Sequence, residues 1–159
     1  MLKNRFFWLA AIVGLILDRL TKLWVVKTMV LSQSIPLLSG VFHITYVVNK
    51  GAAFSLFQGS VWLRWLSLAV SLGLMAMAWF GPRFERWEQL GYGFILSGAL
   101  GNGIDRFVLG HVIDFLDVRL INFPVFNLAD AFINVGIFCL LIAAFRRPPD
   151  DRDQASVKS

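Results

Sequence analysis

Asp114 and Asp130 are the residues whose type and position are best suited to acid–base chemistry. Asp130 lies close to the start of a long apolar segment, and no basic residue lies three or four positions away from it. A carboxylate inside an apolar segment is energetically costly, so it needs a partner or a function. Two carboxylates held close together cannot both ionise cheaply, so one can activate water while the other donates a proton to a carbonyl oxygen. A pair formed by these two aspartates would therefore be suited to the hydrolysis of peptide bonds.

Further polar residues recur at helical spacing within the apolar segments. Asp18 and Lys22 are four residues apart and share one face of a helix, where a structural ion pair and a direct role are equally open. Asn102 and Arg106 are also four residues apart, and Asn127 lies three residues before the acid of the last segment. The alternating direction of successive helices would bring all these groups to one end of a bundle.

The composition indicates that these segments lie in a membrane. Of the 159 residues, 57% are hydrophobic and 16% are charged, whereas soluble domains have about 45–50% apolar and about 25% charged residues. Segments 6–26, 61–80, 90–107 and 125–145 each approach the ~20 residues that a helix needs to cross a bilayer. We therefore predict an α-helical integral membrane protein with four transmembrane helices. A single domain, residues 1–147, would be followed by a polar disordered tail, residues 148–159.

Basic residues predict the orientation of this bundle. In a four-helix protein, the N-terminus, the turn between the second and third helices and the C-terminus lie on the same side of the membrane. These three regions contain Lys3, Arg5, Arg83, Arg86, Arg146 and Arg147. Cytoplasmic loops carry an excess of Lys and Arg, so both termini are expected in the cytoplasm and the polar groups near the outer surface. The first apolar run continues past Asp18 without a small-x-small cleavage site, which favours a retained helix over a signal peptide. The net charge of +5 is explained by this topology, and nucleic-acid binding is not expected.

The loop after the first segment, about residues 32–58, is predicted to contain β-structure. Residues 41–48 are rich in β-branched and aromatic side chains, which favour a strand. We expect a small sheet on the outer face, to which residues 108–124 can contribute. The histidines, His43 and His111, are assigned to this strand and loop rather than to a metal site.

Two short-range patterns have structural interpretations. Asp105 is interpreted as half of a charge pair with its neighbour Arg106 at the membrane edge. Ser97 and Gly101 form a small-xxx-small pair, which predicts close packing against another helix.

Five separated motifs, in this order, resemble those of bacterial lipoprotein signal peptidase, the type II signal peptidase. They are Asp18 with Lys22, residues 49–55 (NKGAAFS), residues 98–106 (GALGNGIDR), residues 112–115 (VIDF) and residues 126–130 (FNLAD). The resemblance extends over about residues 15–145. Two positions depart from the family pattern, since Arg19 stands where glutamine is common and Ala131 stands where serine is common.

This resemblance implies a fold and a set of site residues. The fold is a bundle of four helices with an outward-facing β-sheet cradle. The catalytic aspartates correspond to Asp114 and Asp130. The residues that bind substrate or support the site correspond to Asp18, Lys22, Asn49, Gly51, Ala53, Phe54, Asn102, Arg106 and Asn127.

The resemblance also implies a reaction. The expected substrate is a prolipoprotein whose cysteine carries diacylglycerol, cut immediately before that cysteine without a metal or organic cofactor. The expected enzyme is a monomer in the bacterial cytoplasmic (inner) membrane, in contact with membrane lipid. A small transporter or proton-coupled channel is the alternative, because buried charges also mark ion paths. Such a protein would have polar groups through the full depth of the membrane, whereas here they gather at one end. A scaffold protein would explain the packing residues but not the isolated Asp130.

Overall fold

The computed structural model describes residues 3–51 and 62–146. Along the chain its elements are α1 (Arg5–Thr28), β1 (Ser34–Leu38), β2 (Phe42–Asn49), α2 (Trp62–Phe80), α3 (Arg86–Val108), β3 (Val112–Val118), the 3-10 turn η2 (Arg119–Ile121) and α4 (Leu128–Arg146). The predicted site residues Ala53 and Phe54 and the predicted tail, residues 148–159, lie outside the described residues.

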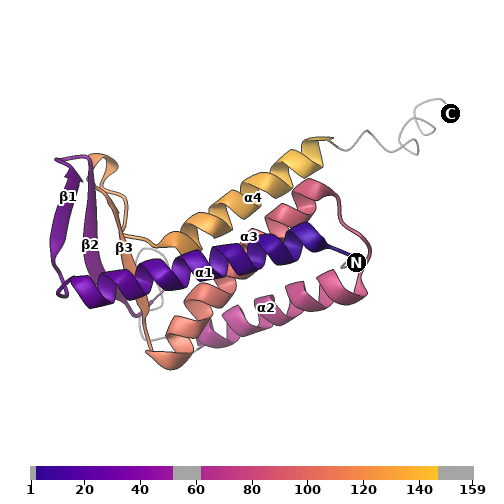
Figure 1. Cartoon of the computed structure of the whole chain (residues 1–159), viewed down its shortest axis with the longest axis horizontal. Helices are drawn as coiled ribbons and strands as arrows, with labels where there is room; N and C mark the ends of the chain where they lie inside the picture. Colours follow the sequence, from indigo (N-terminus) through magenta and orange to yellow (C-terminus); the bar gives the residue numbers. More distant parts are fainter. Residues whose placement is uncertain (1–2, 52–61, 147–159) are drawn as a thin grey trace.

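The four helices run along one another with alternating direction, and the sheet stands at one end of the bundle (Figure 1). The start of α1, the connection from α2 to α3 and the end of α4 all lie at the opposite end (Figure 1). Helix α3 packs against α1, α2 and α4, so it is the central helix. The described residues are therefore mostly helical with one small antiparallel sheet, as the sequence predicts.

Helices α3 and α4 begin three or more residues away from their predicted starts, and local hydrogen bonds explain both differences. Helix α3 begins at Arg86 rather than at residue 90, because Glu85 and Glu88 form a reciprocal capping box in front of it. Helix α4 begins at Leu128 rather than at residue 125. The chain just before it is still extended, because the backbone of Phe126 exchanges hydrogen bonds with Leu116 of β3.

Small residues on α3 allow the neighbouring helices to approach closely. Ser97 is fully buried, and its Oγ lies 2.5 Å from the position that a Cβ on Gly14 of α1 would occupy. A Cβ on Gly101 would lie 2.6 Å from Oδ2 of Asp18, also on α1. The close packing predicted from the Ser97–Gly101 spacing is confirmed, and it brings the charged face of α1 against α3.

The sheet has the order β1-β2-β3, with antiparallel pairing throughout. Its apolar residues Ile44, Ile113 and Phe115 pack against Val25 and Met29 near the end of α1. The strand expected within residues 41–48 is confirmed, and the later loop contributes the third strand. That third strand carries Asp114, so the packing of the sheet on α1 fixes the height of this acid in the bundle.

Two helices of the described residues, α2 and α4, are long and apolar enough to cross a membrane, with mean hydropathies of 1.5 and 2.2. Every 18-residue stretch of α1 contains Asp18, Arg19 and Lys22, so α1 exceeds the charge content expected of a simple membrane span. Helix α3 is enclosed by the other three. The insertion of all four helices in a membrane stays a prediction.

Candidate active site

Asp130 lies in the first turn of α4 and takes part in the cap of that helix. The Oδ1 atom of Asn127 accepts a hydrogen bond from the backbone N of Asp130 at 3.0 Å. In return, Oδ2 of Asp130 accepts one from the backbone N of Asn127 at 3.3 Å. This is a reciprocal capping box with aspartate at the third helical position. The backbone of α4 therefore determines where the Asp130 carboxylate lies.

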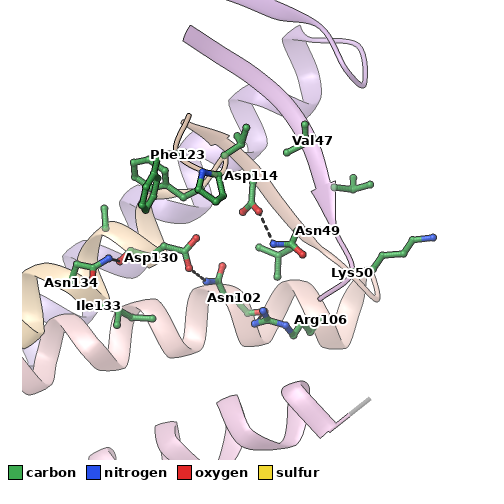
Figure 2. A pocket seen from close by; sticks show the side chains of 16 residues that line it. Val47, Asn49, Lys50, Asn102, Arg106, Asp114, Phe123, Asp130, Ile133 and Asn134 are labelled. Carbon is green, nitrogen blue, oxygen red and sulfur yellow. Dashed lines mark hydrogen bonds between the residues drawn. The ribbon is translucent and has the colours of Figure 1, made fainter. Parts of the chain in front are cut away.

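Asn127 also connects the two acids. Its Nδ2 donates to Oδ1 of Asp114 at 2.6 Å, while the same side chain caps the helix that carries Asp130. The other oxygen of Asp114 accepts a hydrogen bond from Nδ2 of Asn49 on β2 at 3.1 Å. Figure 2 shows Asp114 and Asp130 pointing from β3 and α4 into one space, with Lys50 directed away from it. The structure thus brings the two predicted acids to one site.

Asn102 on α3 orients the Asp130 carboxylate, and Lys22 on α1 orients Asn102. The Lys22 ammonium can only donate, so the amide oxygen of Asn102 faces it, with Nζ and Oδ1 3.0 Å apart. The Nδ2 of Asn102 then points the other way and donates to Oδ1 of Asp130 at 2.8 Å. Asn127 Nδ2 donates to the same Asn102 oxygen at 3.0 Å. Three helices therefore share one polar network around the acids.

Behind this network lies a ring of four alternating charges. Lys22 pairs with Asp18 at 3.1 Å and with Asp105 at 2.8 Å. Arg19 pairs with the same two acids, at 2.9 Å and 2.7 Å. Of the two roles left open for Asp18 and Lys22, the structure shows the ion pair. The interpretation of Asp105 as the partner of Arg106 is wrong, because Asp105 pairs with Arg19 and Lys22 of α1, whereas the Arg106 guanidinium donates to backbone carbonyl oxygens.

Arg106 occupies a different place, at the edge of the cavity that the two acids line. Its NH2 donates to the carbonyl oxygen of Gly51 at 3.2 Å, and its NH1 to that of Asn102 at 3.4 Å. The side chain of Asn49 accepts a hydrogen bond from the backbone N of Gly51 at 2.9 Å, which forms a tight turn after β2. Arg106 thus links α3 to the end of the outer sheet.

The cavity has a volume of about 820 Å³. Its polar wall includes both acids, Asn49, Asn102 and Arg106, and its apolar wall comes from β2, from the chain that leads into α4 and from α4 itself. A volume of this size is typical of ligand sites. Both acids line this cavity, where Asp130 is half-buried and Asp114 is buried.

Burial raises the pKa of Asp114 to about 6, and the nearby charge of Asp130 adds to this effect. Hydrogen bonds from Asn49 and Asn127 act in the opposite direction. An aspartate with a pKa near 6 can hold a proton close to neutral pH. This is the behaviour required of one member of a carboxylate pair that shares a single proton.

The sequence predicted most of these residues but missed two. The predicted residues that contribute to the network or to the cavity wall are Asp18, Lys22, Asn49, Gly51, Asn102, Arg106, Asp114, Asn127 and Asp130. The sequence did not identify Arg19 and Asp105 as members of the charge ring. The spacing of Asp18, Arg19 and Lys22 could have indicated the role of Arg19, because it places three charged groups within little more than one helical turn.

Two carboxylates line one cavity at the end of this helical bundle, and each accepts hydrogen bonds from asparagine side chains. This is the arrangement of an aspartyl hydrolase. A family model for signal peptidase II matches residues 10–146. A lipoprotein signal peptidase from a Cyanothece strain is 68% identical over 154 residues, which cover 94% of the chain and 89% of that relative. That of Nostoc punctiforme is 66% identical over 149 residues, which cover 93% of the chain and 94% of the relative.

Solved structures agree with these sequence relationships. A bacterial membrane enzyme determined by the in meso method has a TM-score of 0.80 at 28% identity, covering 87% of this chain and 86% of that one. A second such structure has a TM-score of 0.77, also at 28% identity, covering 88% and 92%. The chain belongs to the signal peptidase II family and is an aspartyl protease. These relationships give no support to the alternative of a transporter or channel.

Proposed function

We propose that Asp114 and Asp130 are the catalytic pair of a peptidase that removes the signal peptide from diacylglyceryl-modified prolipoproteins, immediately before the lipidated cysteine. The observation that carries this proposal is the position of Asn127, which donates to Asp114 at 2.6 Å and caps the helix that holds Asp130. The relatives are lipoprotein signal peptidases, which is consistent with a lipid-modified precursor as substrate.

The chemistry follows from one proton shared by two acids. The ionised carboxylate removes a proton from a water molecule, which attacks the carbonyl carbon of the scissile peptide bond. The protonated carboxyl donates to the carbonyl oxygen as the tetrahedral intermediate forms. Collapse of that intermediate breaks the C–N bond and transfers a proton to the leaving amine, which is the amino group of the lipidated cysteine. The asparagine donors fix both carboxylates, so little reorganisation is needed.

Four membrane-spanning helices place this chemistry at the lipid surface. The outward face of α1 is apolar, with Leu9, Ile12 and Leu20 each more than half exposed at 59%, 55% and 58%. Such a face suits contact with acyl chains, whereas the charges of α1 face α3. Helix α3 is shielded by its neighbours and needs little apolar surface of its own. The low hydropathy of both helices is therefore compatible with spans.

The active site would lie near the outer face of the bacterial cytoplasmic membrane, with both termini in the cytoplasm. The end of the bundle away from the sheet carries the basic residues Lys3, Arg5, Arg83, Arg86 and Arg146, which supports a cytoplasmic location. The bias is moderate, because the sheet end carries Lys27, Lys50, Arg64, Arg106 and Arg119. A substrate anchored by its diacylglycerol presents its cleavage site at the depth of the outer interface. The lipid stays in the bilayer while the peptide enters the cavity. A single copy of the chain supplies both acids, so we propose a monomer.

Replacement of either acid by asparagine tests the proposal. Asp114→Asn and Asp130→Asn keep the side-chain shape but prevent proton sharing, so each should reduce cleavage of a diacylglyceryl-modified precursor by about 10²- to 10⁴-fold. The matched control is Asp117→Asn, on the same strand as Asp114, whose partner is Arg119 at the outer part of the sheet. Full activity in either acid variant, in protein that unfolds at the wild-type temperature, would refute the catalytic pair.

A further inference from the structure

Behind the candidate active site, four charged side chains form a ring in which every neighbouring pair is an ion pair. Each of its cations pairs with both of its carboxylates: Arg19 reaches Asp18 at 2.9 Å and Asp105 at 2.7 Å, and Lys22 reaches them at 3.1 Å and 2.8 Å. Two positive and two negative charges make the ring neutral. Arg19 also donates to the carbonyl oxygen of Gly101 at 3.0 Å, which ties α1 to α3.

Arg19 supplies the second positive charge of this ring and is its most exposed member. The side chains of Asp18 and Asp105 have no exposed area, whereas that of Arg19 is 28% exposed. Buried carboxylates are stabilised by paired cations, and the single charge of Lys22 balances only one of these two. A guanidinium can serve both because it has five N–H groups in a fixed planar fork and keeps its charge at all relevant pH values.

The ring determines which acceptors the Lys22 ammonium contacts. The three N–H groups of its ammonium have three acceptors, which are Asp18, Asp105 and the amide oxygen of Asn102. The third of these bonds holds Asn102 so that its Nδ2 donates to Asp130. If the two carboxylates lacked a second cation, they would compete more strongly for the ammonium and draw it away from the neutral amide.

The ring also reaches α4 directly. Oδ1 of Asp18 accepts a hydrogen bond from the backbone N of Ala129 at 3.1 Å, in the first turn of α4. Asp130 is the next residue along the chain. Arg19 binds the other oxygen of Asp18, so it restrains the carboxylate that caps this turn. Two routes therefore run from Arg19 to Asp130, one through Lys22 and one through Asp18.

We propose that Arg19 is a positioning residue for the carboxylate pair, which acts by closing a neutral charge ring that fixes Asn102 and the first turn of α4. This inference rests on the proposed catalytic role of Asp114 and Asp130. The described residues that line the cavity do not include Arg19, so its effect on substrate passes through the acids. Glutamine at this position would retain hydrogen bonding but leave the ring with a net charge of −1.

The experiment compares Arg19→Gln with Arg19→Lys in purified full-length protein, using a diacylglyceryl-modified precursor. The glutamine variant should lose about 10- to 100-fold in kcat with little change in KM, because a small displacement of catalytic groups slows the chemical step. The lysine variant restores the positive charge and should recover most of kcat. Arg119→Gln is the matched control, because it removes a different Arg–Asp pair, on the sheet, and should leave kcat unchanged.

The pH profile gives a readout that a purely structural role would not move. The charged groups that face Asp114 are Asp130 on α4, Lys22 on α1 and Arg106 on α3, while Lys50 of the cavity rim points away. A net negative ring behind Lys22 weakens the positive potential at the acids. The alkaline limb of kcat/KM should therefore move to higher pH in the glutamine variant and return in the lysine variant.

Three results would overturn the inference. Wild-type kcat and an unshifted pH profile in Arg19→Gln, measured at a temperature where the protein is folded, would remove Arg19 from the catalytic apparatus. A lower unfolding temperature without loss of kcat would make the ring a stabilising element only. A change confined to KM would indicate contact with substrate. Failure of the proposed function is distinguishable, because it appears as activity in Asp114→Asn or Asp130→Asn, independently of Arg19.

Discussion

Asn127 has two roles that depend on different atoms of one side chain. Its oxygen caps α4, and its nitrogen donates to Asp114 and to Asn102. The cap sets the start of the helix that carries Asp130, while the nitrogen sets the separation of that helix from β3. A change at this position therefore affects both stability and geometry, and two substitutions can separate these effects.

Asn127→Ala should remove both roles. We expect a loss of about 1 kcal/mol in helix stability from the missing cap and a loss of about 10²-fold in kcat from misplaced acids. Asn127→Ser keeps a side-chain oxygen suited to capping but has no amide nitrogen. It should therefore unfold near the wild-type temperature in detergent yet cleave as slowly as the alanine variant. Wild-type cleavage by the serine variant would show that the bond to Asp114 is dispensable.

The pKa of Asp114 predicts a pH dependence. Burial, with the charge of Asp130, raises this pKa to about 6, so the pair loses its last proton as the pH rises through that value. The mechanism needs that proton, so kcat/KM of the free enzyme should fall as the pH rises above about 6. Asn49 donates to the ionised carboxylate and lowers its pKa. Asn49→Ala should therefore shift the descending limb to higher pH, and an unshifted limb would contradict this assignment.

The charge ring shows what residue types and spacing could and could not predict. The Asp18–Lys22 pair was predictable because both partners lie on one helix. Asp105 was assigned to the wrong arginine because its true partners, Arg19 and Lys22, lie more than 80 positions away along the chain, as the 86-residue separation of Arg19 from Asp105 shows. Contacts of this kind depend on how helices pack, which local spacing does not reveal.

At the scale of elements, the start of α4 is predictable from a capping-box pattern. Residues 127–130 read Asn-Leu-Ala-Asp, which has the spacing of a capping box and predicts a helix from Leu128. The polar contacts at the other end of the bundle were not predictable in this way. There the buried side chain of Asn4 donates to the carbonyl oxygen of Ala78 and accepts from the backbone N of Phe84. These partners are backbone atoms, which carry no signal in the sequence.

The close contact between α3 and α4 gives a prediction for helix packing. A Cβ at Gly98 would overlap the carbonyl oxygen of Ala129, directly before Asp130. Gly98→Ala should therefore displace the first turn of α4, destabilise the fold by about 1–3 kcal/mol and reduce kcat. Gly73→Ala is the control, because a Cβ there has no neighbour within 4 Å. It should be neutral or slightly stabilising, since alanine favours helix by about 1 kcal/mol over glycine. Equal unfolding temperatures for the two variants would contradict this packing.

At the scale of the whole molecule, the polar network is built from residues of both the sheet and the helices. The helices position Lys22, Asn102 and Asp130 of the polar network, and the sheet supplies Asn49 and Asp114. The acids therefore meet where the bundle ends and the sheet begins (Figure 1). Large apolar side chains of the helices, such as Leu9, Ile12 and Leu20, are exposed. If the bundle spans a membrane, this junction is at the interface of lipid and water.

The proposed topology makes a prediction that site-directed labelling can check. The chain has one cysteine, Cys139, which is buried in α4, so Cys139→Ala provides a background for new cysteines. Leu109→Cys places a thiol at the sheet end of α3, where the native side chain is 45% exposed, and Pro82→Cys places one in the exposed turn between α2 and α3. In intact spheroplasts, a membrane-impermeant maleimide should label the thiol at 109 at once and the thiol at 82 only after permeabilisation. The reverse pattern would invert the bundle, and labelling of both thiols in intact spheroplasts would mean that α2 and α3 do not cross the membrane as spans.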